Sequence, residues 1–178
     1  MGRYQGIVIA GFGGQGILSV GRIIAEAGMI DGMDVSWLPS YGPEIRGGTA
    51  YVHVIMSDEK IGSPLLNSAT VLIAMNKPSF EKYQSMVVDG GIIIVDGSLI
   101  DSKIEDTRRE FYSLPATKVA SDKGSLAYAN IILAGKMIAK TNIIKVESFE
   151  KALYKVLPER YQNMIPEEME ILKFGMEY

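Results

Sequence analysis

The sequence predicts a single α/β domain in three layers, with helices on both faces of a mainly parallel sheet. Short runs of apolar and β-branched residues alternate along the chain with longer segments of helical periodicity. This alternation is typical of α/β domains, and runs that are apolar on both sides are typical of buried parallel strands. Because the chain has 178 residues, we expect one domain over residues 1–178, with residues 140–178 as a more charged C-terminal helical region.

The strands are predicted from their apolar runs and from the glycines that bound them. Tyr4–Ala10 is short, rich in β-branched residues and closed by glycines. Ala50–Met56 alternates, so that Tyr51, His53 and Ile55 face one way and the residues between them the other. The other expected strands are Asp34–Leu38, Thr70–Met75, Ile92–Val95 and a short strand near an edge, Glu110–Leu114.

The helices are predicted from apolar stripes and from their start signals. Ile17–Met29 places its apolar residues on one stripe, and Pro78–Met86 opens with a proline. Leu126–Ala139 is apolar nearly all round, as a packed central helix would be. Ser148–Val156 is amphipathic, and a last helix begins at Pro166 with acidic residues in its first turn.

Composition excludes several classes of protein. A chain without cysteine has no disulfide, thiolate metal site, thiolate-held iron–sulfur cluster or cysteine nucleophile. The net charge of −3 and the lack of a basic run argue against a nucleic-acid partner. No apolar stretch approaches the roughly 20 residues of a membrane span, and the N-terminus does not fit a signal peptide. We therefore expect a soluble cytoplasmic protein without a membrane partner.

Two polar residues stand out on otherwise apolar segments. His53 is the only histidine, which excludes a multi-histidine metal site, and we expect it to be a packed side chain rather than a catalyst. Asn130 lies inside the apolar helix, so it must find a hydrogen-bond partner. No catalytic residue and no metal ligand is predicted in this chain.

A glycine-rich turn, GFGGQG at 11–16, follows the first strand and opens the first helix. In this context glycines allow a tight turn and close approach to a phosphate, and the helix N-terminus offers free N–H groups to an anion. The acid that nicotinamide sites place at the end of the second strand is missing here. Binding of another phosphate, or close packing of helix on strand, is therefore favoured over NAD. The candidate anion-binding residues here are Gly11, Gly13, Gly14, Gln15 and Gly16.

A second loop, expected over residues 39–49, contains two of the few charges in the N-terminal third, Glu44 and Arg46. Arg46 can bind a phosphate or carboxylate bidentately, and an internal Glu44–Arg46 ion pair is an equally weighted alternative. Asn76, at the end of another strand, is expected either to touch ligand or to cap a helix. The residues of this loop that we expect at an interface or active site are Tyr41, Gly42, Pro43, Glu44, Arg46, Gly47, Gly48 and Thr49.

The first 57 residues hold only seven charged residues but twelve of the 19 glycines. Such a segment is either the buried centre of the sheet or a surface covered by a partner, since interface cores are depleted in charge. Because both glycine-rich loops lie in this segment, we favour the partner.

Four segments together resemble the gamma subunit of 2-oxoacid:ferredoxin oxidoreductases of the 2-oxoglutarate or 2-oxoisovalerate type, in the wider pyruvate:ferredoxin oxidoreductase gamma-domain family. They are GFGGQG at 11–16, PSYGPEIRGGTA at 39–50, IGSP at 61–64 and AMNKPS at 74–79. AYANIILAG at 127–135 and LPERYQNMIPEEMEILKFG at 157–175 extend the resemblance nearly end to end. Ile45 stands where the family usually has methionine, which is a mild apolar change.

This resemblance implies a Rossmann-like module within a complex of alpha, beta, gamma and delta (ferredoxin-like) subunits. Such complexes decarboxylate a 2-oxoacid oxidatively, pass electrons to ferredoxin and transfer the acyl group to coenzyme A. The resemblance places thiamine pyrophosphate, Mg and the iron–sulfur clusters in the partner subunits and no firmly bound cofactor in this chain. The isolated chain is expected to be inactive, with a homodimer as an open alternative.

We hypothesise that the two glycine loops face the active-site channel and help to hold coenzyme A, with 2-oxoglutarate as the expected substrate. Two alternatives stay open. The chain could be a purely structural subunit that docks onto its partners without a ligand, or a free nucleotide-binding oxidoreductase.

Overall fold

The computed structural model describes residues 2–41, 49–101 and 107–178. Within these ranges, six strands form one sheet in the order β2-β3-β1-β4-β5-β6. They are β1 (Tyr4–Phe12), β2 (Asp34–Tyr41), β3 (Thr49–Ser57), β4 (Ala69–Ala74), β5 (Val87–Asp96) and β6 (Glu110–Leu114).

The sheet is mainly parallel, as predicted. Strands β1, β4, β5 and β6 pair in parallel, while β3 runs antiparallel to both of its neighbours, β1 and β2. Consequently β2 points the same way as β1 although it does not touch it. The insertion of β3 between them places Thr49 opposite Phe12 and Ala50 opposite Gly11, at the carboxyl end of β1.

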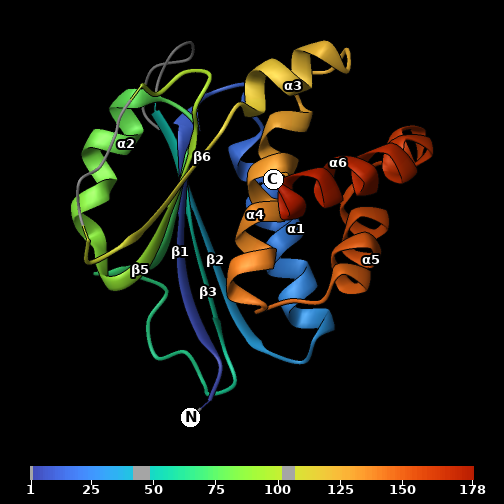
Figure 1. Ribbon diagram of the computed structural model, residues 1–178. Coiled ribbons are helices and arrows are strands. Elements are labelled where there is room, and N and C mark those ends of the chain that lie inside the picture. Colours follow the sequence, from blue (N-terminus) through green and yellow to red (C-terminus); the bar gives the residue numbers. More distant parts are fainter. Residues whose placement is uncertain (1, 42–48, 102–106) are drawn as a thin grey trace.

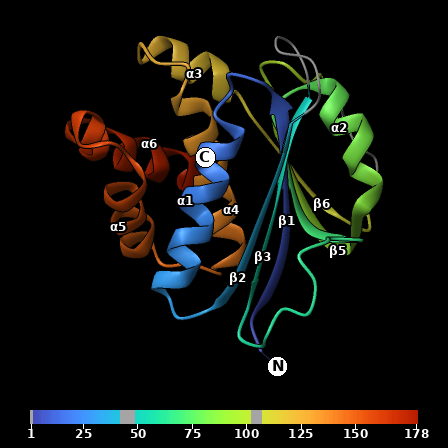
Figure 2. The ribbon, with the colours of Figure 1, turned by 180° about the vertical axis from the view of Figure 1, so that it is seen from behind.

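The two helical layers are unequal (Figures 1 and 2). On one face of the sheet lies α2 (Lys77–Tyr83), followed by the short helix η1 (Gln84–Met86). The opposite face carries the remaining helices. They are α1 (Ile17–Ile30), α3 (Ala116–Asp122), α4 (Tyr128–Thr141), α5 (Val146–Val156), the short η2 (Glu159–Met164) and α6 (Ile165–Glu177).

Alternation along β1 builds a core on each side of the sheet. Ile7 and Ile9 pack against the face covered by α1 and α4, whereas Val8 and Ala10 face α2. All four side chains are fully buried. The central place of β1 and β3 therefore accounts for much of the low charge of the first 57 residues, because ionised side chains are rarely buried.

The predicted elements are found, but two of their limits were wrong and one short helix was not predicted. β2 continues to Tyr41, through Pro39, which was assigned to the loop over 39–49. Because β2 is an edge strand, the missing N–H of proline is tolerated there. β5 starts at Val87 rather than at Ile92, because its glycines hid the strand pattern, and the seven-residue α3 was not predicted since it is too short to show helical periodicity.

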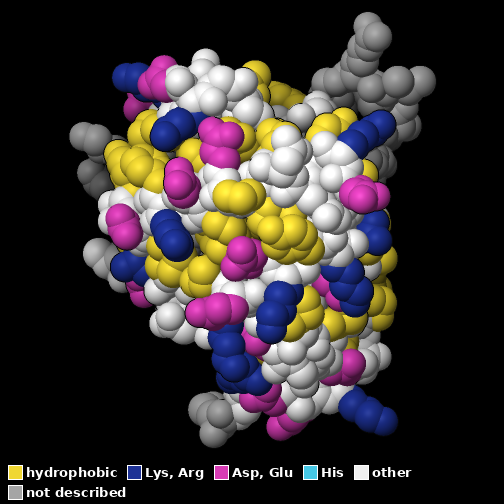
Figure 3. Space-filling model, turned by 90° about the vertical axis from the view of Figure 1, so that its right-hand side faces the viewer, with side chains coloured by type: hydrophobic (Ala, Val, Ile, Leu, Met, Phe, Trp, Pro, Cys, Tyr) yellow, Lys and Arg dark blue, Asp and Glu magenta, His cyan; other side chains and the backbone are white. Residues whose placement is uncertain are grey.

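The C-terminal region after α4 contains α5, η2 and α6. Figure 3 shows that this side of the molecule, over α5 and α6, carries acidic and basic side chains scattered among hydrophobic ones. No helix in the described part of the chain is long and apolar enough to span a bilayer.

Helices α4 and α6 approach each other more closely than side chains would allow. A Cβ built on Gly135 of α4 would lie 2.2 Å from the carbonyl oxygen of Leu172, and one on Gly175 of α6 would lie 2.0 Å from that of Ile132. Backbone atoms cannot retreat as a flexible side chain can, so both positions require glycine. The crossing fixes the position of α4, which lies directly on the sheet.

We expect Gly135→Ala to destabilise the protein by about 3 kcal/mol, because the new methyl group overpacks a backbone-to-backbone contact. Helix propensity alone predicts the opposite, a gain of about 1 kcal/mol. Urea unfolding followed by circular dichroism measures the difference. Gly62→Ala, where a Cβ meets nothing within 4 Å, is the control and should be close to neutral. A stabilised Gly135→Ala variant would contradict this account of the crossing.

Candidate functional site

The glycine-rich turn lies at the carboxyl edge of the sheet, between the end of β1 and the start of α1. Gly14 and Gly16 have positive φ angles of 95° and 73°, in the region that favours glycine. Gly13 and Gly14 are exposed, whereas Gly11 is buried. The turn therefore presents only part of its backbone to the outside.

Gln15 ties the turn to the neighbouring parallel strand. Its side-chain oxygen accepts a hydrogen bond from the backbone N–H of Phe12 (2.7 Å), and its amide nitrogen donates to the carbonyl of Met75 (3.1 Å). Met75 follows β4, so this one amide spans the gap between the carboxyl ends of β1 and β4. Open α/β sheets usually bind ligands in such a gap, and here the chain's own side chain fills it.

Two glycines of the turn are required by internal contacts rather than by a ligand. A Cβ on Gly11 would lie 2.5 Å from the side-chain oxygen of Gln15 and 2.8 Å from Cδ1 of Ile17. A Cβ on Gly16 would lie 2.2 Å from the amide nitrogen of Asn130. The contacts of Gly11 fit the predicted alternative of close helix-on-strand packing, Gly16 instead makes room for a side chain of α4, and Gly13 and Gly14 stay open to the outside.

The hydrogen-bond partner predicted for Asn130 is the turn itself. Its side-chain amide donates to the carbonyl of Gln15 at 3.1 Å, although 115 residues separate the two in the sequence. Asn130 is 6% exposed, on the first turn of α4. The apolar helix therefore carries its one buried amide at the point where it supports the glycine turn.

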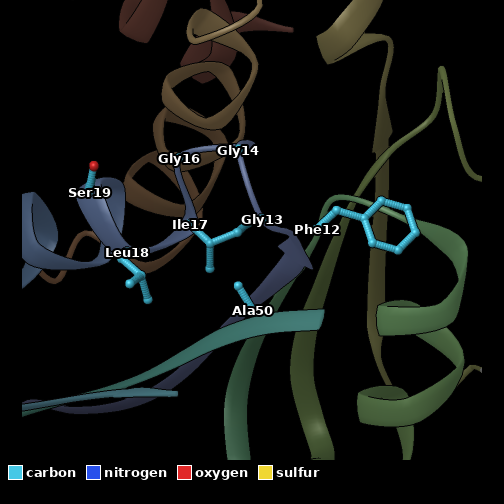
Figure 4. A pocket seen from close by; sticks show the side chains of 8 residues that line it. All are labelled: Phe12, Gly13, Gly14, Gly16, Ile17, Leu18, Ser19 and Ala50. Carbon is cyan, nitrogen blue, oxygen red and sulfur yellow. The ribbon is translucent and has the colours of Figure 1, made fainter. Parts of the chain in front are cut away.

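A pocket of about 240 Å³, which we call the turn pocket, opens beside the exposed glycines (Figure 4). Ile17 and Ala50 point toward each other across it, whereas the Phe12 ring points away. Among the described residues, no side chain caps the N-terminus of α1, so its first N–H groups are available to an anion. The pocket is lined by Phe12, Gly13, Gly14, Gly16, Ile17, Leu18, Ser19 and Ala50.

A second pocket, of about 250 Å³ and mostly apolar, lies on the other side of Gly14 and Gln15. We call it the apolar pocket; the other residues lining it are Met75, Leu99, Thr117, Leu126 and Ala129. Leu99 and Leu126 are 46% and 65% exposed, which is high for leucine side chains at a pocket rim. Sequence reasoning missed this pocket, because it is formed by loops whose spatial proximity depends on the sheet order.

The buried carboxylate of Asp96 shapes the wall of the apolar pocket. It accepts hydrogen bonds from the backbone N–H groups of Ser98 (3.0 Å) and Thr117 (3.2 Å) and from the Thr117 hydroxyl. These bonds join the end of β5 to the start of α3 and leave the carboxylate without exposure. Asp96 is thus a structural residue, which the sequence showed only as the end of a strand.

Asn76 caps α2, which was one of its two predicted roles. Its side-chain oxygen accepts from the N–H of Ser79 at 2.8 Å, and a proline follows in the first turn. Its amide nitrogen is buried without a partner, as are the hydroxyl oxygens of Ser79 and Tyr83 on the same helix. The sequence analysis missed Ser79 and Tyr83. Their spacing from Asn76, which places all three on one helical face, was the signal that could have identified them.

The second loop falls largely outside the described residues, which include neither Glu44 nor Arg46. Its two ends are described: Tyr41 is the last residue of β2, and Thr49 is the first residue of β3. Both ends lie at the same edge as the glycine turn, because Thr49 pairs with Phe12 and Tyr41 with Ala50. The predicted loop residues outside the description are Gly42, Pro43, Glu44, Arg46, Gly47 and Gly48.

The sheet order adds to the argument against a nicotinamide site. Such sites take an acid from the strand next to β1, at its carboxyl end. Here β3 occupies that place in reverse direction, and it contributes Ala50 to the turn pocket. In the described residues, no group of three or more histidine, aspartate or glutamate side chains is placed to hold a metal ion.

His53 is packed on the α2 side of the sheet. Its ring lies 5.2 Å from that of Tyr51, centroid to centroid, and both ring nitrogens are buried without a hydrogen-bond partner. Burial lowers the pKa of His53 below its usual value. The ring contact with Tyr51 and the buried ring nitrogens fit the predicted packing role.

Comparison with known proteins agrees with this geometry. Residues 6–178 match the family model of pyruvate ferredoxin/flavodoxin oxidoreductase. The chain is 34% identical over 175 residues to the 2-oxoglutarate synthase subunit KorC of Methanocaldococcus jannaschii, covering 97% of this chain and 91% of that protein. It is 36% identical over 173 residues to the ketoisovalerate oxidoreductase subunit VorA of Methanothermobacter thermautotrophicus, where it covers 97% of this chain but only 36% of the relative.

Solved structures show the same fold. The gamma subunit of a keto/oxoacid ferredoxin oxidoreductase from Geobacter sulfurreducens superposes with a TM-score of 0.80 at 30% identity, covering 97% of this chain and 96% of that one. A 2-oxoglutarate:ferredoxin oxidoreductase from Magnetococcus marinus gives a TM-score of 0.85 at 23% identity. The superposition covers 98% of this chain but 31% of the Magnetococcus chain, so this chain corresponds to one part of that longer chain.

We expect the stability of the protein to fall as the pH drops below about 6.5, the usual pKa of histidine. The unfolded chain takes up a proton on His53 more readily than the folded one, so protonation favours unfolding. His53→Phe keeps a ring against Tyr51 and removes this titration. Burial raises the pKa of Glu168, which acts in the opposite direction, but Glu168 is present in both proteins. Urea unfolding from pH 7 to 5 should therefore show a flatter pH dependence in His53→Phe, and identical slopes would contradict the effect.

Proposed function

The chain belongs to the pyruvate ferredoxin/flavodoxin oxidoreductase family, and on that premise we propose that it is the gamma subunit of a 2-oxoacid:ferredoxin oxidoreductase. The complex would convert a 2-oxoacid, 2-oxoglutarate in our proposal, to an acyl-CoA and pass the electrons to ferredoxin. The observation that carries this proposal is the nearly full-length match to a subunit named 2-oxoglutarate synthase KorC. The partners are alpha, beta and delta subunits.

We propose further that this chain contributes to coenzyme A binding. Coenzyme A is a polyanion, and the turn pocket offers the uncapped N-terminus of α1 beside two exposed glycines. Backbone N–H groups at a helix N-terminus bind phosphate through hydrogen bonds and the helix dipole. A volume of about 240 Å³ suits one phosphate group and its surroundings rather than the whole molecule.

In this proposal the chain binds and orients the acceptor and carries out no bond cleavage. Gly13 and Gly14 let the acceptor approach the backbone, and Gln15 shapes the turn from within. Arg46 and Asn76 are proposed as further contacts from the neighbouring loops. Thiamine pyrophosphate, Mg and the iron–sulfur clusters of the partner subunits would supply decarboxylation and electron transfer.

A charge placed in the turn pocket tests the acceptor site. Gly14 has open space around its Cβ position and a positive φ, which asparagine and aspartate tolerate better than other residues. In the assembled complex, we expect Gly14→Asp to raise the apparent KM for coenzyme A about tenfold over Gly14→Asn, because a carboxylate repels the phosphate at short range. The two variants share size and backbone cost and differ in charge alone. Equal KM values, with assembly intact, would exclude an anion from this pocket.

Arg46 provides a second and independent test. In the assembled complex, we expect Arg46→Ala to raise the apparent KM for coenzyme A, because it removes a bidentate phosphate donor. The KM for the 2-oxoacid is the internal control and should stay constant. An unchanged KM for coenzyme A would remove Arg46 from the proposed site.

A purely structural role is the second candidate, favoured by the exposed leucines at the apolar pocket. Leu99 and Leu126 together form an apolar rim at the same edge of the sheet as both loops. If the edge only docks, Leu126→Glu should abolish co-purification with the alpha subunit, while Gly14→Asp leaves the KM for coenzyme A unchanged. Leu126→Glu and Gly14→Asp together therefore distinguish a purely structural role from coenzyme A binding.

A further inference from the structure

We propose that Asn130, on α4, is a positioning residue that sets the shape of the glycine turn and thereby the affinity of the turn pocket for its acceptor. This inference rests on the proposed function and adds to it a residue from the distant half of the chain.

The contact of Asn130 with the turn decides which way a backbone N–H group points. Its amide holds the carbonyl of Gln15 at 3.1 Å, on the side of the turn that faces α4. A peptide unit is planar and trans, so the N–H of Gly16, in the same unit, points away from α4. Gly16 lines the turn pocket. Asn130 therefore orients a donor of the pocket without reaching the pocket itself.

The space beside Gly16 is taken up by this contact. A Cβ on Gly16 would overlap the Asn130 amide at 2.2 Å, so the amide occupies the position that a side chain at residue 16 would need. The positive φ of Gly16 and the buried amide are thus two parts of one local structure. In the described part of the chain, Asn130 is the donor that holds the carbonyl of Gln15, so loss of the amide would hold this peptide unit less firmly.

The helix that presents Asn130 is itself held in place. The glycine crossing near Gly135 leaves no room for α4 to slide along α6. Nearer to Asn130, the hydroxyl of Tyr128 donates to the carboxylate of Glu167 on α6 at 2.7 Å. Burial first of all, and then this hydrogen bond, raise the pKa of Tyr128 to about 12, so the hydroxyl stays a donor at neutral pH. The turn is therefore positioned against a rigid pair of helices.

The test removes the donor of Asn130 without adding charge. In the assembled complex, we expect Asn130→Leu to raise the apparent KM for coenzyme A about tenfold, as a small misplacement of a binding group does. This tenfold effect corresponds to about 1.4 kcal/mol. The kcat and the KM for the 2-oxoacid should change less than about twofold, because the effect is confined to the turn pocket. In the complex without coenzyme A, amide hydrogen exchange should become faster in residues 12–17.

The matched control is Thr141→Val at the other end of α4. The Thr141 hydroxyl donates to the carbonyl of Met137 at 2.8 Å, so this variant also removes a donor from a backbone carbonyl. It should lower stability without changing the KM for coenzyme A or exchange in the turn. If Asn130→Leu does not assemble, Asn130→Ser replaces it, with the same direction expected for both measurements.

Each outcome decides the proposal. Faster exchange in the turn together with a raised KM for coenzyme A supports it. Unchanged exchange overturns it, and so does faster exchange with an unchanged KM. In the latter case, the comparison of Gly14→Asp with Gly14→Asn distinguishes failure of the positioning role from failure of the acceptor site. A raised KM in Gly14→Asp keeps the acceptor site and removes only the positioning role, whereas equal values in Gly14→Asp and Gly14→Asn remove the acceptor site as well.

Discussion

The side-chain amide of Gln15 bridges the carboxyl ends of β1 and β4, and the site is arranged around this bridge. The oxygen of the amide holds the N–H of Phe12, and its nitrogen holds the carbonyl of Met75. The crevice that a sheet of this kind opens between two such strands is therefore filled from within. Free space remains on either side: the turn pocket toward β3 and the apolar pocket toward β5 and α3. The same bridge forbids a side chain at Gly11, so part of the glycine pattern is a packing requirement.

The unequal helical layers give the two sides of this turn different properties. On the α1 and α4 side, a large core and the glycine crossing with α6 hold the turn through Asn130. On the α2 side, the core is small, and Asn76, Ser79, Tyr83 and His53 carry buried polar atoms without partners. Unpaired buried polar groups are costly, typically about 1–3 kcal/mol each. The α1 and α4 side therefore supports the backbone of the turn. Most of the unpaired buried polar atoms in the described residues lie on the α2 side, and Glu168 on α6 carries one more.

In the proposed function, this chain binds the acceptor and the partner subunits carry the chemistry. The sequence has no cysteine and a single histidine, and burial lowers the pKa of that histidine. The exposed parts of the turn are backbone N–H groups and glycines, which suit an anionic ligand and no proton transfer. Such a chain fits a complex in which decarboxylation and electron transfer belong to other subunits. In this proposal, the chain contributes to acceptor binding through the shape of the glycine turn.

Much of this protein was determined by local sequence. The β-branched runs, the helical stripe of α1 and the glycines with positive φ led to a mainly parallel α/β domain and to the place of the turn, because these patterns act within a few residues. The need of Asn130 for a partner was also evident, since a buried amide must be hydrogen-bonded. The identity of the partner was not, because Gln15 lies 115 residues away. Likewise, the reversed β3 between β1 and β2, the filling of the crevice by Gln15 and the apolar pocket depend on the order of strands. That order is set by long-range packing of the whole chain, so only the tertiary structure decided which glycines face a ligand and which make room for another side chain.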